Sequence, residues 1–489
     1  MSVSSQQVLS DLYRSFPPLR PVMAGLYGYQ LRWKRYGLNP ERLVEMALER
    51  ETWLPSAWER WQKEELARVL HHAATRVPYY RTMWAARRRA GDRSSPELLE
   101  NWPILEKEEL RKNFRGFVSD KHRIKDSELE TTSGTTGSPV TVVLPRRTVR
   151  AWYALCEARF RRWNGITRDS RWAMIGSQLV APVQQTSPPF WVWNEGLNQL
   201  YMSAYHLTYE NLPSYLEAMA RYKVEYVWGH SSALNALTSA ALRSGQKFPQ
   251  LRIALSSSEP LTAKQRIRIG AAFRCPVRET YGMSEMVAGA SECEAGRMHL
   301  WPEVGFYEVV EGTEAVQPGN SGDLICTSFL NREMPLIRYR VGDRVALSSD
   351  KGGCKCGRLL PMLASIDGRA SDMLFTKSGR MVTPTSMEIV FDVDLPIREG
   401  QIVQESLQSV RVIYVPNGRR SSSVEQILSE RVRARLGDVD VVLEPVQSIP
   451  RGANGKLRAV VCALSSEEKR SLRIQAGVAV SAAVPAGSH

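Results

Sequence analysis

A run of hydroxyl and glycine residues lies in the first third of the chain. It reads Thr131, Thr132, Ser133, Gly134, Thr135, Thr136, Gly137, Ser138, Pro139 (TTSGTTGSP), directly before the β-rich run VTVVL. Glycine lets backbone N–H groups approach an anion closely, and hydroxyls can hydrogen-bond phosphate oxygens. The Gly-Lys-Ser/Thr ending of the common phosphate loop is missing. The run predicts a phosphate-binding loop, with a flexible Ser/Thr/Gly surface loop as the alternative.

Strand and helix patterns alternate outward from this loop, from about Thr131 to Ile366. The β-rich stretches are VTVVL, VEYVWG, LRIALSS, CPVRETYG and GDLICTS, and the helical ones are TVRAWYALCEARFRRW, NLPSYLEAMARY, SALNALTSAALRSG and TAKQRIRIGAAF. Alternation at this spacing predicts an α/β domain with its strands in layered sheets.

Domain limits follow from length and from changes in pattern. A chain of 489 residues is expected to form two or three domains. Helical periodicity over 40–90 predicts a mainly helical opening, taken as 1–120. Beyond Asp367 a separate set begins (SVRVIYVP, SVEQILSERVRARL, VDVVLEP). We expect a large N-terminal domain over 1–367, a small α+β domain over 368–475, and a disordered tail over 476–489.

Four further motifs follow the loop in order. They are ETYGMSE (279–285), IRYRVGDRV (337–345), DGRASDML (367–374) and PRGANGKLR (450–458). In this order and spacing the series resembles the adenylate-forming superfamily of acyl-CoA synthetases, luciferases and nonribosomal adenylation domains. VPYYR (77–81), PILEKEELRKNF (103–114) and a Cys/His cluster make the chain similar to the phenylacetate-CoA ligase and CapK-like branch.

The resemblance implies a fold and a reaction. The fold is a large α/β domain followed by a small, mobile α+β domain, and the reaction is ATP-dependent conversion of a carboxylic acid to its acyl-adenylate with release of pyrophosphate. A carboxylate is a poor electrophile, so an enzyme must hold the triphosphate, offset developing charge and align the acid. Transfer of the acyl group to CoA is the expected second step.

The resemblance also assigns the nucleotide site. Residues Thr131 to Gly137 would hold the β- and γ-phosphates, and Glu285 would hold Mg²⁺. The adenine would lie between two segments, Ser258, Glu259, Pro260 and Tyr281, Gly282. Asp343 would bind the ribose hydroxyls, with Arg369 adding a contact. Read alone, Glu285 could be a surface carboxylate and Asp343 part of an ordinary Gly-Asp turn.

Lys456 lies in the Gly-flanked segment NGKLR of the small domain. The resemblance gives its ammonium the role of bridging the substrate carboxylate and the α-phosphate in the transition state. An isolated lysine would be a solvated surface residue. Because the lysine and the phosphate loop lie on separate domains, the chemistry is expected to require domain closure.

The hinge departs from the family pattern. Relatives commonly read GRSDD, whereas this chain has Gly368-Arg369-Ala370-Ser371-Asp372. Ser371 therefore leaves open an alternative in which the acyl group goes to an amine, a hydroxyl or a carrier-protein thiol. A remote alternative is a non-catalytic scaffold that binds a polyanion, against which the intact motifs count.

The acid pocket is expected near strand VEYVWG and the turn after ETYG. Its candidate residues are His230, Ser231, Met283 and Ser284. His230 could equally be a satisfied core histidine. Trp191, Trp193 and Trp228 would favour an aryl or arylacetic acid, or could be core residues.

Four side chains of types that bind metals occur as two pairs. Cys293 precedes His299, and Cys354 and Cys356 form a CKCGR knuckle. Three sulfurs and one imidazole suit tetrahedral Zn²⁺, and a full ligand set predicts a structural site. Unrelated buried cysteines are the alternative.

Composition sets the remaining expectations. The chain is 43% hydrophobic and 24% charged, as in globular proteins. Its formal charge is +14, of which +11 precedes Gly368, because 16 basic and 13 acidic residues follow from that position. The arginines are scattered, so we expect no nucleic-acid partner. Seven cysteines without a signal sequence or an apolar span predict a cytoplasmic enzyme without a disulfide framework. The oligomeric state is left open.

Overall fold

The computed structural model places most of the chain. It describes residues 13, 17–132, 139–176, 180–182, 184–208, 210–244, 248–350, 353–391, 395–450, 457–465, 467–469 and 471–472. The expected tail over 476–489 lies outside these ranges. No helix within them has the length and apolar character needed to cross a bilayer.

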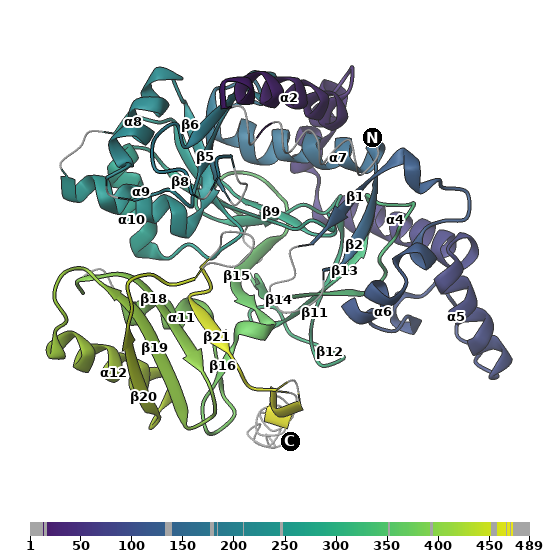
Figure 1. Cartoon of the computed structure of the whole chain (residues 1–489). Helices are drawn as coiled ribbons and strands as arrows, with labels where there is room; N and C mark the ends of the chain where they lie inside the picture. The colour runs from purple at the N-terminus through teal and green to yellow at the C-terminus, as the bar shows by residue number, and fades with distance from the viewer. Residues whose placement is uncertain are drawn as a thin grey trace. The chain divides into compact units, whose positions relative to one another are not determined.

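The chain divides into two compact units (Figure 1). The large unit comprises Met1–Val341 and Val345–Ser365, and the small unit comprises Gly342–Arg344 and Ile366–His489. The mixed α/β character expected for the first and the α+β character expected for the second are confirmed.

Helices form the N-terminal part of the large unit. They are α2 (Arg20–Tyr36), α3 (Glu41–Glu49), α4 (Pro55–Arg76), α5 (Pro78–Arg89) and α6 (Lys107–Lys112). Proline opens α4 and α5, where the missing N–H would have no partner in the helix. The helical periodicity over 40–90 is therefore confirmed.

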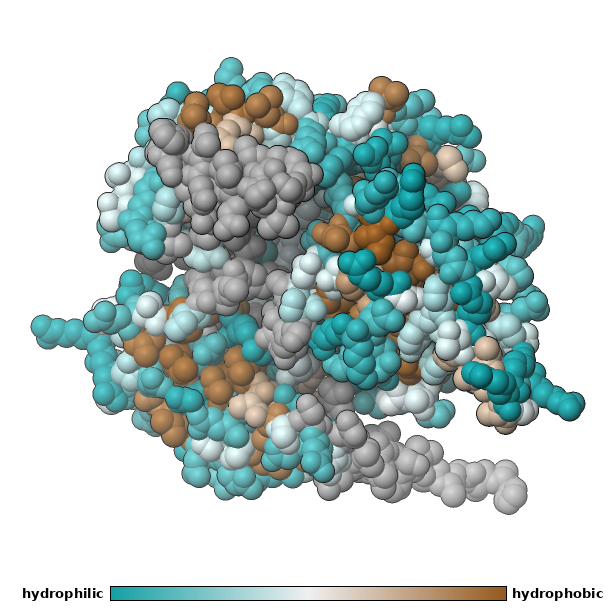
Figure 2. Space-filling view, turned by 45° about the vertical axis from the view of Figure 1, so that its right-hand side comes forward, coloured by the Kyte–Doolittle hydropathy of each residue, from teal (hydrophilic) through white to brown (hydrophobic). Residues whose placement is uncertain are grey.

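Helix α2 packs through its glycines. A Cβ atom at Gly28 would lie 1.7 Å from Oδ1 of Asn194, so only glycine permits this approach. Several apolar residues of α2, and Leu19 just before it, are exposed: Leu19, Val22, Leu26, Tyr27, Tyr29 and Trp33. Figure 2 shows apolar residues at the top of the molecule, the level at which α2 lies in Figure 1.

The large unit is built on a mixed sheet. Its strands are β3 (Trp172–Gly176), β4 (Trp191–Asn194), β5 (Gln199–Ser203), β6 (Tyr226–His230), β7 (Ile253–Ser257), β8 (Val277–Gly282), β9 (Gly289–Glu292), β10 (Met298–Leu300), β11 (Gly305–Glu311), β12 (Glu314–Ala315), β13 (Ser321–Ser328), β14 (Tyr339–Leu347) and β15 (Met362–Arg369). Their order is β12-β11-β13-β14-β15-β10-β9-β8-β7-β6-β3-β5-β4. Strand β15 continues into the small unit, to which Gly342–Arg344 in the middle of β14 also belong. Strands β1 (Ser127–Thr131) and β2 (Thr141–Pro145) form a separate antiparallel pair on either side of the TTSGTTG run.

Strands β5, β3, β6, β7 and β8 run parallel. Helices on both faces cover them: α7 (Arg146–Cys156), α8 (Leu212–Arg221), α9 (Ser231–Ser244) and α10 (Ala263–Phe273). Ala173 and Val227 join the core of α8, α9 and α10, whereas Trp172 and Tyr226 join the core of α3 and α7. Burial on both faces explains why these strands read as continuous apolar runs.

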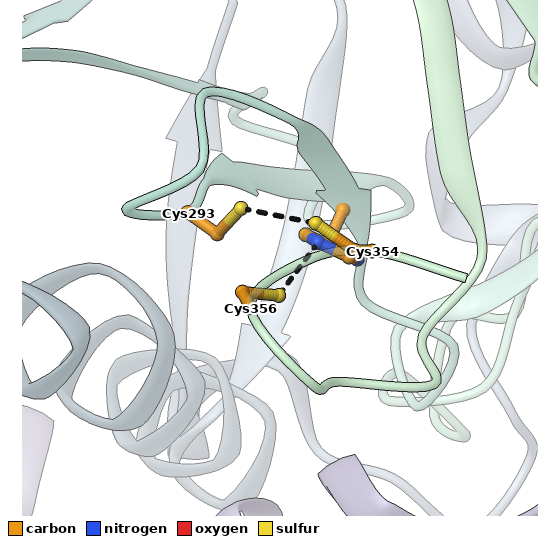
Figure 3. Close-up of side chains that lie close together, drawn as sticks. Cys293, Cys354 and Cys356 are labelled. Carbon is orange, nitrogen blue, oxygen red and sulfur yellow. Dashed lines mark hydrogen bonds between the residues drawn. The ribbon is translucent and has the colours of Figure 1, made fainter. Parts of the chain in front are cut away.

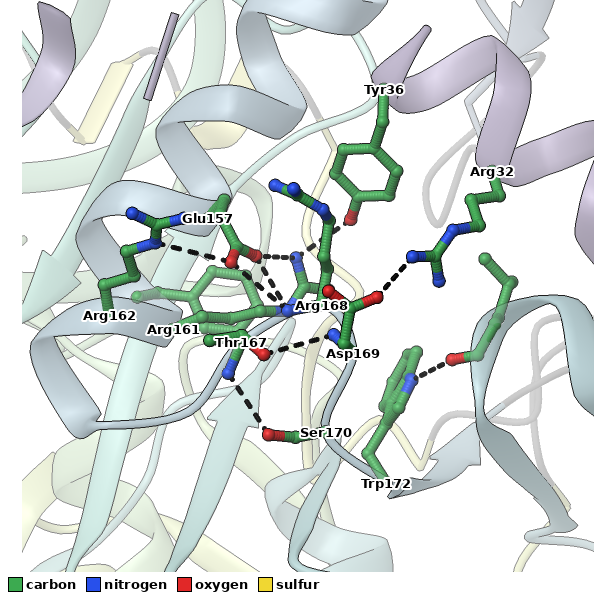
Figure 4. A network of polar contacts seen from close by, with 12 residues as sticks. Arg32, Tyr36, Glu157, Arg161, Arg162, Thr167, Arg168, Asp169, Ser170 and Trp172 are labelled. Carbon is green, nitrogen blue, oxygen red and sulfur yellow. Dashed lines mark hydrogen bonds and ion pairs between the residues drawn. The ribbon is translucent and has the colours of Figure 1, made fainter. Parts of the chain in front are cut away.

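A buried polar network joins α2 to this sheet (Figure 4). Arg161 donates to the phenol oxygens of Tyr36, at 3.1 Å, and of Tyr226, at 3.2 Å. Glu157 pairs with Arg161 and accepts the backbone N–H of Arg168 at 3.0 Å. Because Glu157 and Arg161 are almost fully buried, each charge depends on these partners.

The small unit has its own core and a four-stranded sheet of order β20-β19-β18-β21. Leu428 and Val432 of α12 are fully buried in that core. The elements are β16 (Leu374–Phe375), β17 (Met381–Val382), α11 (Pro384–Glu388), β18 (Ile397–Gln404), β19 (Ser409–Pro416), α12 (Ser422–Leu436), β20 (Asp440–Pro445) and β21 (Val460–Cys462).

Candidate functional site

The parallel strands bring the predicted motifs to one edge of the sheet. Strand β6 ends at His230, which lies opposite Ser257 of β7, and Ser257 lies opposite Thr280 of β8. The carboxyl ends of parallel strands are the usual ligand-binding edge of α/β sheets. The residues that follow β6, β7 and β8 therefore start from neighbouring positions.

The side chain of Glu259 is held by hydrogen bonds at the N-terminus of α9. Its Oε2 accepts the backbone N–H of Ser232 at 3.0 Å and the hydroxyl of Ser231 at 3.3 Å. A carboxylate is favoured here by the partial positive charge of a helix N-terminus. Ser258, just before it, adopts a left-handed conformation with φ of 70°, which turns the chain sharply after β7. The predicted Ser258, Glu259, Pro260 segment is thus anchored to the predicted Ser231.

Gly282 packs against a tryptophan that the sequence did not reveal. A Cβ atom at Gly282 would lie 3.0 Å from Cζ2 of Trp152 on α7. This contact would be tighter than most that a Cβ atom makes, so an alanine here would require Trp152 or the backbone to shift. Tyr281 and Gly282 pair with Ala290 and Gly289 of β9, which fixes their backbone. No local pattern could have linked Trp152 to a motif so far along the chain.

Glu285 is buried rather than on the surface. Only 5% of the residue is exposed, and its Oε1 accepts the phenol of Tyr339 at 2.9 Å. The turn that contains it is closed by the N–H of Met286, which donates to the carbonyl of Met283 at 3.0 Å. The reading of Glu285 as an ordinary surface carboxylate is therefore wrong.

The ends of the predicted phosphate loop are held together. Thr132 and Val140 exchange backbone and side-chain hydrogen bonds, at 2.9 Å and 3.0 Å. In the strand before the loop, desolvation raises the pKa of the Glu130 carboxyl, and Ser284 of the Glu285 turn is close enough to oppose that shift. Ser133, Gly134, Thr135, Thr136, Gly137 and Lys456 lie outside the described residues.

Asp343 and Arg369 meet in the small unit. The Nε of Arg369 lies 3.0 Å from Oδ1 of Asp343, whose side chain is 10% exposed. The two residues expected at the ribose are therefore brought together as an ion pair.

The aromatic candidates Trp191, Trp193 and Trp228 pack in or against the core of the large unit. Trp228 is packed against Phe160 and Trp172, and its indole N–H donates to Ser257 at 2.7 Å. Trp193 is stacked on Tyr222. The rings therefore give no evidence for an aryl acid.

The four predicted metal ligands converge in the antiparallel half of the sheet (Figure 3). The ligand atoms of Cys293, His299, Cys354 and Cys356 all lie within 4.8 Å of one another. Sγ of Cys293 is 3.6 Å from Sγ of Cys354, and Sγ of Cys356 is 3.4 Å from Nε2 of His299. Tetrahedral zinc with ordinary bond lengths would separate its ligand atoms by about 3.3–3.8 Å. The donor set and spacing fit such a metal.

The protonation states of the cluster also suit metal binding. Nδ1 of His299 lies 3.2 Å from the carbonyl of Leu360, which favours a proton on Nδ1 and leaves Nε2 directed at the sulfurs. Burial lowers the pKa of His299, so its imidazole is neutral. Burial raises the pKa of Cys293 to about 12, a shift that a bound cation would reverse by displacing the proton. For Cys356, burial would raise the pKa, but hydrogen bonds with Arg358, Cys354 and Cys293 together outweigh it and hold the pKa below the usual value.

An ionic network that the sequence did not reveal surrounds this cluster. Glu51, near the N-terminus, accepts from the indole of Trp163 at 2.8 Å and from Nε of Arg358 at 3.1 Å. The guanidinium of Arg358 lies 4.3 Å from the centre of the Trp163 ring. The loop that carries two of the cysteines is thereby tied to the N-terminal helical region.

Comparison with known proteins shows the family to which the chain belongs. Residues 58–325 match the model of the AMP-binding enzyme family, and residues 374–463 match the CapK C-terminal domain. The first match covers more than half of the chain, which therefore belongs to the AMP-binding enzyme family.

Particular relatives share most of the chain. Protein CapK of Staphylococcus aureus is 26% identical over 372 residues, covering 73% of this chain and 79% of CapK. The phenylacetate-coenzyme A ligase of Thermus thermophilus is 24% identical, covering 82% and 95%. Among solved structures, a 2-hydroxyisobutyryl-CoA ligase matches with a TM-score of 0.65 at 20% identity, covering 88% and 94%. The fold is thus that of the adenylate-forming CoA ligases.

Proposed function

We propose that the protein is an AMP-forming acid-CoA ligase. It activates a carboxylic acid with ATP, releases pyrophosphate, and transfers the acyl group to CoA. The observation that carries this proposal is the arrangement of Glu259 after β7 and of Tyr281 and Glu285 at the end of the neighbouring parallel strand β8, in a chain of the AMP-binding enzyme family. Phenylacetate-CoA ligases among its relatives support the ligase activity.

In this proposal each segment at the carboxyl edge of the parallel strands has a role. The Thr131 to Gly137 run holds the β- and γ-phosphates, and the adenine lies between Glu259 and Tyr281. Glu285 holds Mg²⁺, which would offset negative charge on the phosphates. Its burial and its hydrogen bond to Tyr339 support that role, because an oriented carboxylate binds a cation better than a freely rotating one.

The small unit supplies the remaining groups. Asp343 and Arg369 bind the ribose, and Lys456 bridges the acid and the α-phosphate. The carboxylate oxygen attacks the α-phosphorus, the bond to the bridging oxygen of the β-phosphate breaks, and pyrophosphate leaves. Residues 368–475 act as the mobile small domain and 1–367 as the large one.

We propose an aryl or arylacetic acid as the substrate and His230, Ser231, Met283 and Ser284 as part of its pocket. The phenylacetate-CoA ligase relatives support this class of acid. They also favour CoA over an amine, a hydroxyl or a carrier protein as the acceptor, despite Ser371 at the hinge.

The Cys293, His299, Cys354 and Cys356 cluster holds a structural Zn²⁺ in this proposal. Four protein ligands leave no position for substrate, so the metal supports the fold rather than the reaction. ATP, CoA and reduced metal-binding thiols together are conditions of the cytoplasm, where we place the enzyme.

Pyrophosphate release tests the proposal. The assay uses ATP and Mg²⁺ with phenylacetate, benzoate, 2-hydroxyisobutyrate or acetate, with and without CoA. Wild type should release pyrophosphate with at least one aryl acid, faster when CoA is present. Lys456→Ala and Glu285→Gln should lose this activity, and Glu45→Gln, exposed on α3, should keep it. Absence of release with every acid, or full activity of Lys456→Ala, would refute it.

A further inference from the structure

Helix α2 is reversed relative to an ordinary surface helix. A helix on the surface of a globular protein normally buries its large apolar residues and exposes polar ones. In α2 the buried positions include Gly25 and Gly28, which pack against η8 (Glu195–Leu197). A Cβ atom at Gly196 would lie 2.4 Å from the carbonyl carbon of Gly28, so the two backbones are in close contact. The helix is therefore held by its small residues, and its large apolar residues are left outside.

These large residues form an apolar stripe along the exposed side of α2. Its members recur every three or four residues, so they lie on one side of the helix, and they are 43% to 68% exposed: Leu19, Val22, Leu26, Tyr29 and Trp33. At 1.5 Å per residue the stripe is about 21 Å long. Figure 1 shows α2 at the outer surface of the large unit. A contiguous stripe of this kind marks an interaction site, whereas single exposed apolar residues do not.

The charge of α2 is positive. The helix contains four basic residues and no acidic one: Arg20, Arg32, Lys34 and Arg35. Arg32 pairs with Asp169, and Nζ of Lys34 lies 3.2 Å from Glu128. With both acidic partners counted, basic residues still outnumber acidic ones two to one. Because each residue turns the helix by about 100°, Arg32 and Lys34 lie on either side of the stripe at Trp33.

The combination of apolar stripe and positive charge fits the surface of an anionic membrane. A helix with Leu, Tyr and Trp on one side and Lys or Arg beside them lies flat between lipid headgroups and acyl chains. Tyrosine and tryptophan suit this boundary because their rings are apolar and carry one polar group. The long stems of Arg32 and Lys34 can keep their charges at the level of the lipid phosphates. A second copy of the chain fits less well, because two α2 helices would bring like charges together.

We propose that α2 docks the protein on a membrane surface that contains anionic lipids. The helix lies along the bilayer with its apolar stripe among the headgroups, and its basic residues pair with lipid phosphates. Binding is reversible, because the stripe reaches only the boundary of the acyl chains. This contact goes beyond the proposed ligase activity and does not depend on it.

Flotation of the full-length protein with lipid vesicles tests the proposal. The vesicles are pure phosphatidylcholine, or phosphatidylcholine with about 30% phosphatidylglycerol, which is anionic. Leu26→Glu places a negative charge in the stripe, and Trp33→Ser removes its largest ring. The matched control is Ile267→Glu on α10, because Ile267 is 71% exposed and Leu26 is 68% exposed.

Wild type should float with the anionic vesicles and stay in solution with the neutral ones, and added salt should weaken its binding. Leu26→Glu and Trp33→Ser should lower the vesicle partition coefficient by about tenfold or more, because apolar burial in the interface is lost. Ile267→Glu should bind as wild type does. Leu26→Glu and Ile267→Glu should melt near the wild-type temperature, since both positions are exposed.

Three results would overturn the proposal. They are no flotation of wild type with anionic vesicles, equal flotation with neutral ones, and an equal loss of binding in Ile267→Glu and Leu26→Glu. Sedimentation velocity of the same proteins examines the other occupant. A dimer that Leu26→Glu dissociates, without flotation of wild type, would assign the stripe to a second copy of the chain. Flotation needs neither ATP nor an acid, so failure of the proposed ligase activity would leave its outcome unaffected.

Discussion

The hydrogen bond from Tyr339 to Glu285 can be removed by changing one atom. The phenol oxygen lies 2.9 Å from Oε1 of Glu285, and the two residues are 0% and 5% exposed. Tyr339→Phe keeps the ring and its packing and removes only the donor. Oε1 then loses the hydrogen bond that fixes the rotation of the carboxylate. Binding of Mg²⁺ must therefore also restrict the rotation of the Glu285 side chain, which weakens the binding.

The size of the effect follows from the charge and burial of the pair. A hydrogen bond to a charged group contributes about 1.5–3 kcal/mol, which corresponds to about one to two powers of ten in an equilibrium constant. Loss of a group that orients a metal ligand costs about ten- to a hundredfold in metal affinity or activity. We therefore expect the Mg²⁺ concentration for half-maximal pyrophosphate release to rise by about that factor, with a smaller change in kcat at saturating Mg²⁺.

Tyr80 provides a matched control. Its hydroxyl donates to the carbonyl of Pro335 and accepts from the N–H of Ile337, both at 3.1 Å, and it is 2% exposed. Tyr80→Phe removes a buried phenol that does not contact Glu285, so it should lower the melting temperature and leave the Mg²⁺ dependence unchanged. If Tyr339→Phe and Tyr80→Phe show the same dependence of pyrophosphate release on Mg²⁺ concentration, Glu285 is not a metal ligand oriented by Tyr339.

Three further perturbations have defined outcomes. Cys354→Ser should reduce zinc to well below one per chain in emission spectrometry and lower the melting temperature, because a thiolate ligand is lost. Gly282→Ala should raise the KM for ATP, measured by pyrophosphate release, because its Cβ would lie 3.0 Å from Trp152 and must displace the indole or the backbone. Burial raises the pKa of Glu279 to about 7, so the folded state binds more protons than the unfolded state between about pH 4.5 and 7. The stability of wild type relative to Glu279→Gln should therefore fall as pH rises through that window and level off above it; a pH-independent difference in denaturant titrations would refute the assignment.

The sequence predicted the parallel half of the sheet because local pattern and tertiary position agree there. Strands β6, β7 and β8 are buried on both faces, and the helices between them carry a 3.6-residue period. Glu285 was identified from its motif, but its partner was not, since Tyr339 lies 54 residues away. The alternation in IRYRV indicates which of its residues share a face of the strand. It does not indicate which carboxylate packs against that face.

The cluster of Cys293, His299, Cys354 and Cys356 shows the same limit. Its four side chains could be expected to lie together because cysteine and histidine pairs carry their chemistry in their identity. Glu51 and Arg358, which form an ion pair beside the cluster, are 307 residues apart, and both belong to residue types that are usually exposed. Trp193 and Trp228 were ambiguous for the opposite reason, because aromatic residues suit a pocket and a core equally well. Only their stacking on Tyr222 and Trp172 resolves them as core.

The Cys/His cluster and the segment proposed to bind the nucleotide share a pair of strands. Strand β9 pairs with β8 at Gly289 opposite Gly282, and its last residue, Glu292, directly precedes the ligand Cys293. His299 lies in β10, which pairs with β9 on the other side. A metal bound by Cys293 and His299 therefore closes the β9–β10 hairpin that aligns the backbone of β8.

Removal of the metal should consequently impair adenylation as well as stability. Protein treated with a zinc chelator and then freed of chelator should melt at a lower temperature and release pyrophosphate more slowly, with a raised KM for ATP, because the backbone at Tyr281 and Gly282 loses its support. Restoring Zn²⁺ should reverse both changes. If the metal-free protein melts earlier but keeps the wild-type KM and kcat below its melting temperature, then β8 holds its position without the hairpin, and the metal stabilises only the antiparallel half of the sheet.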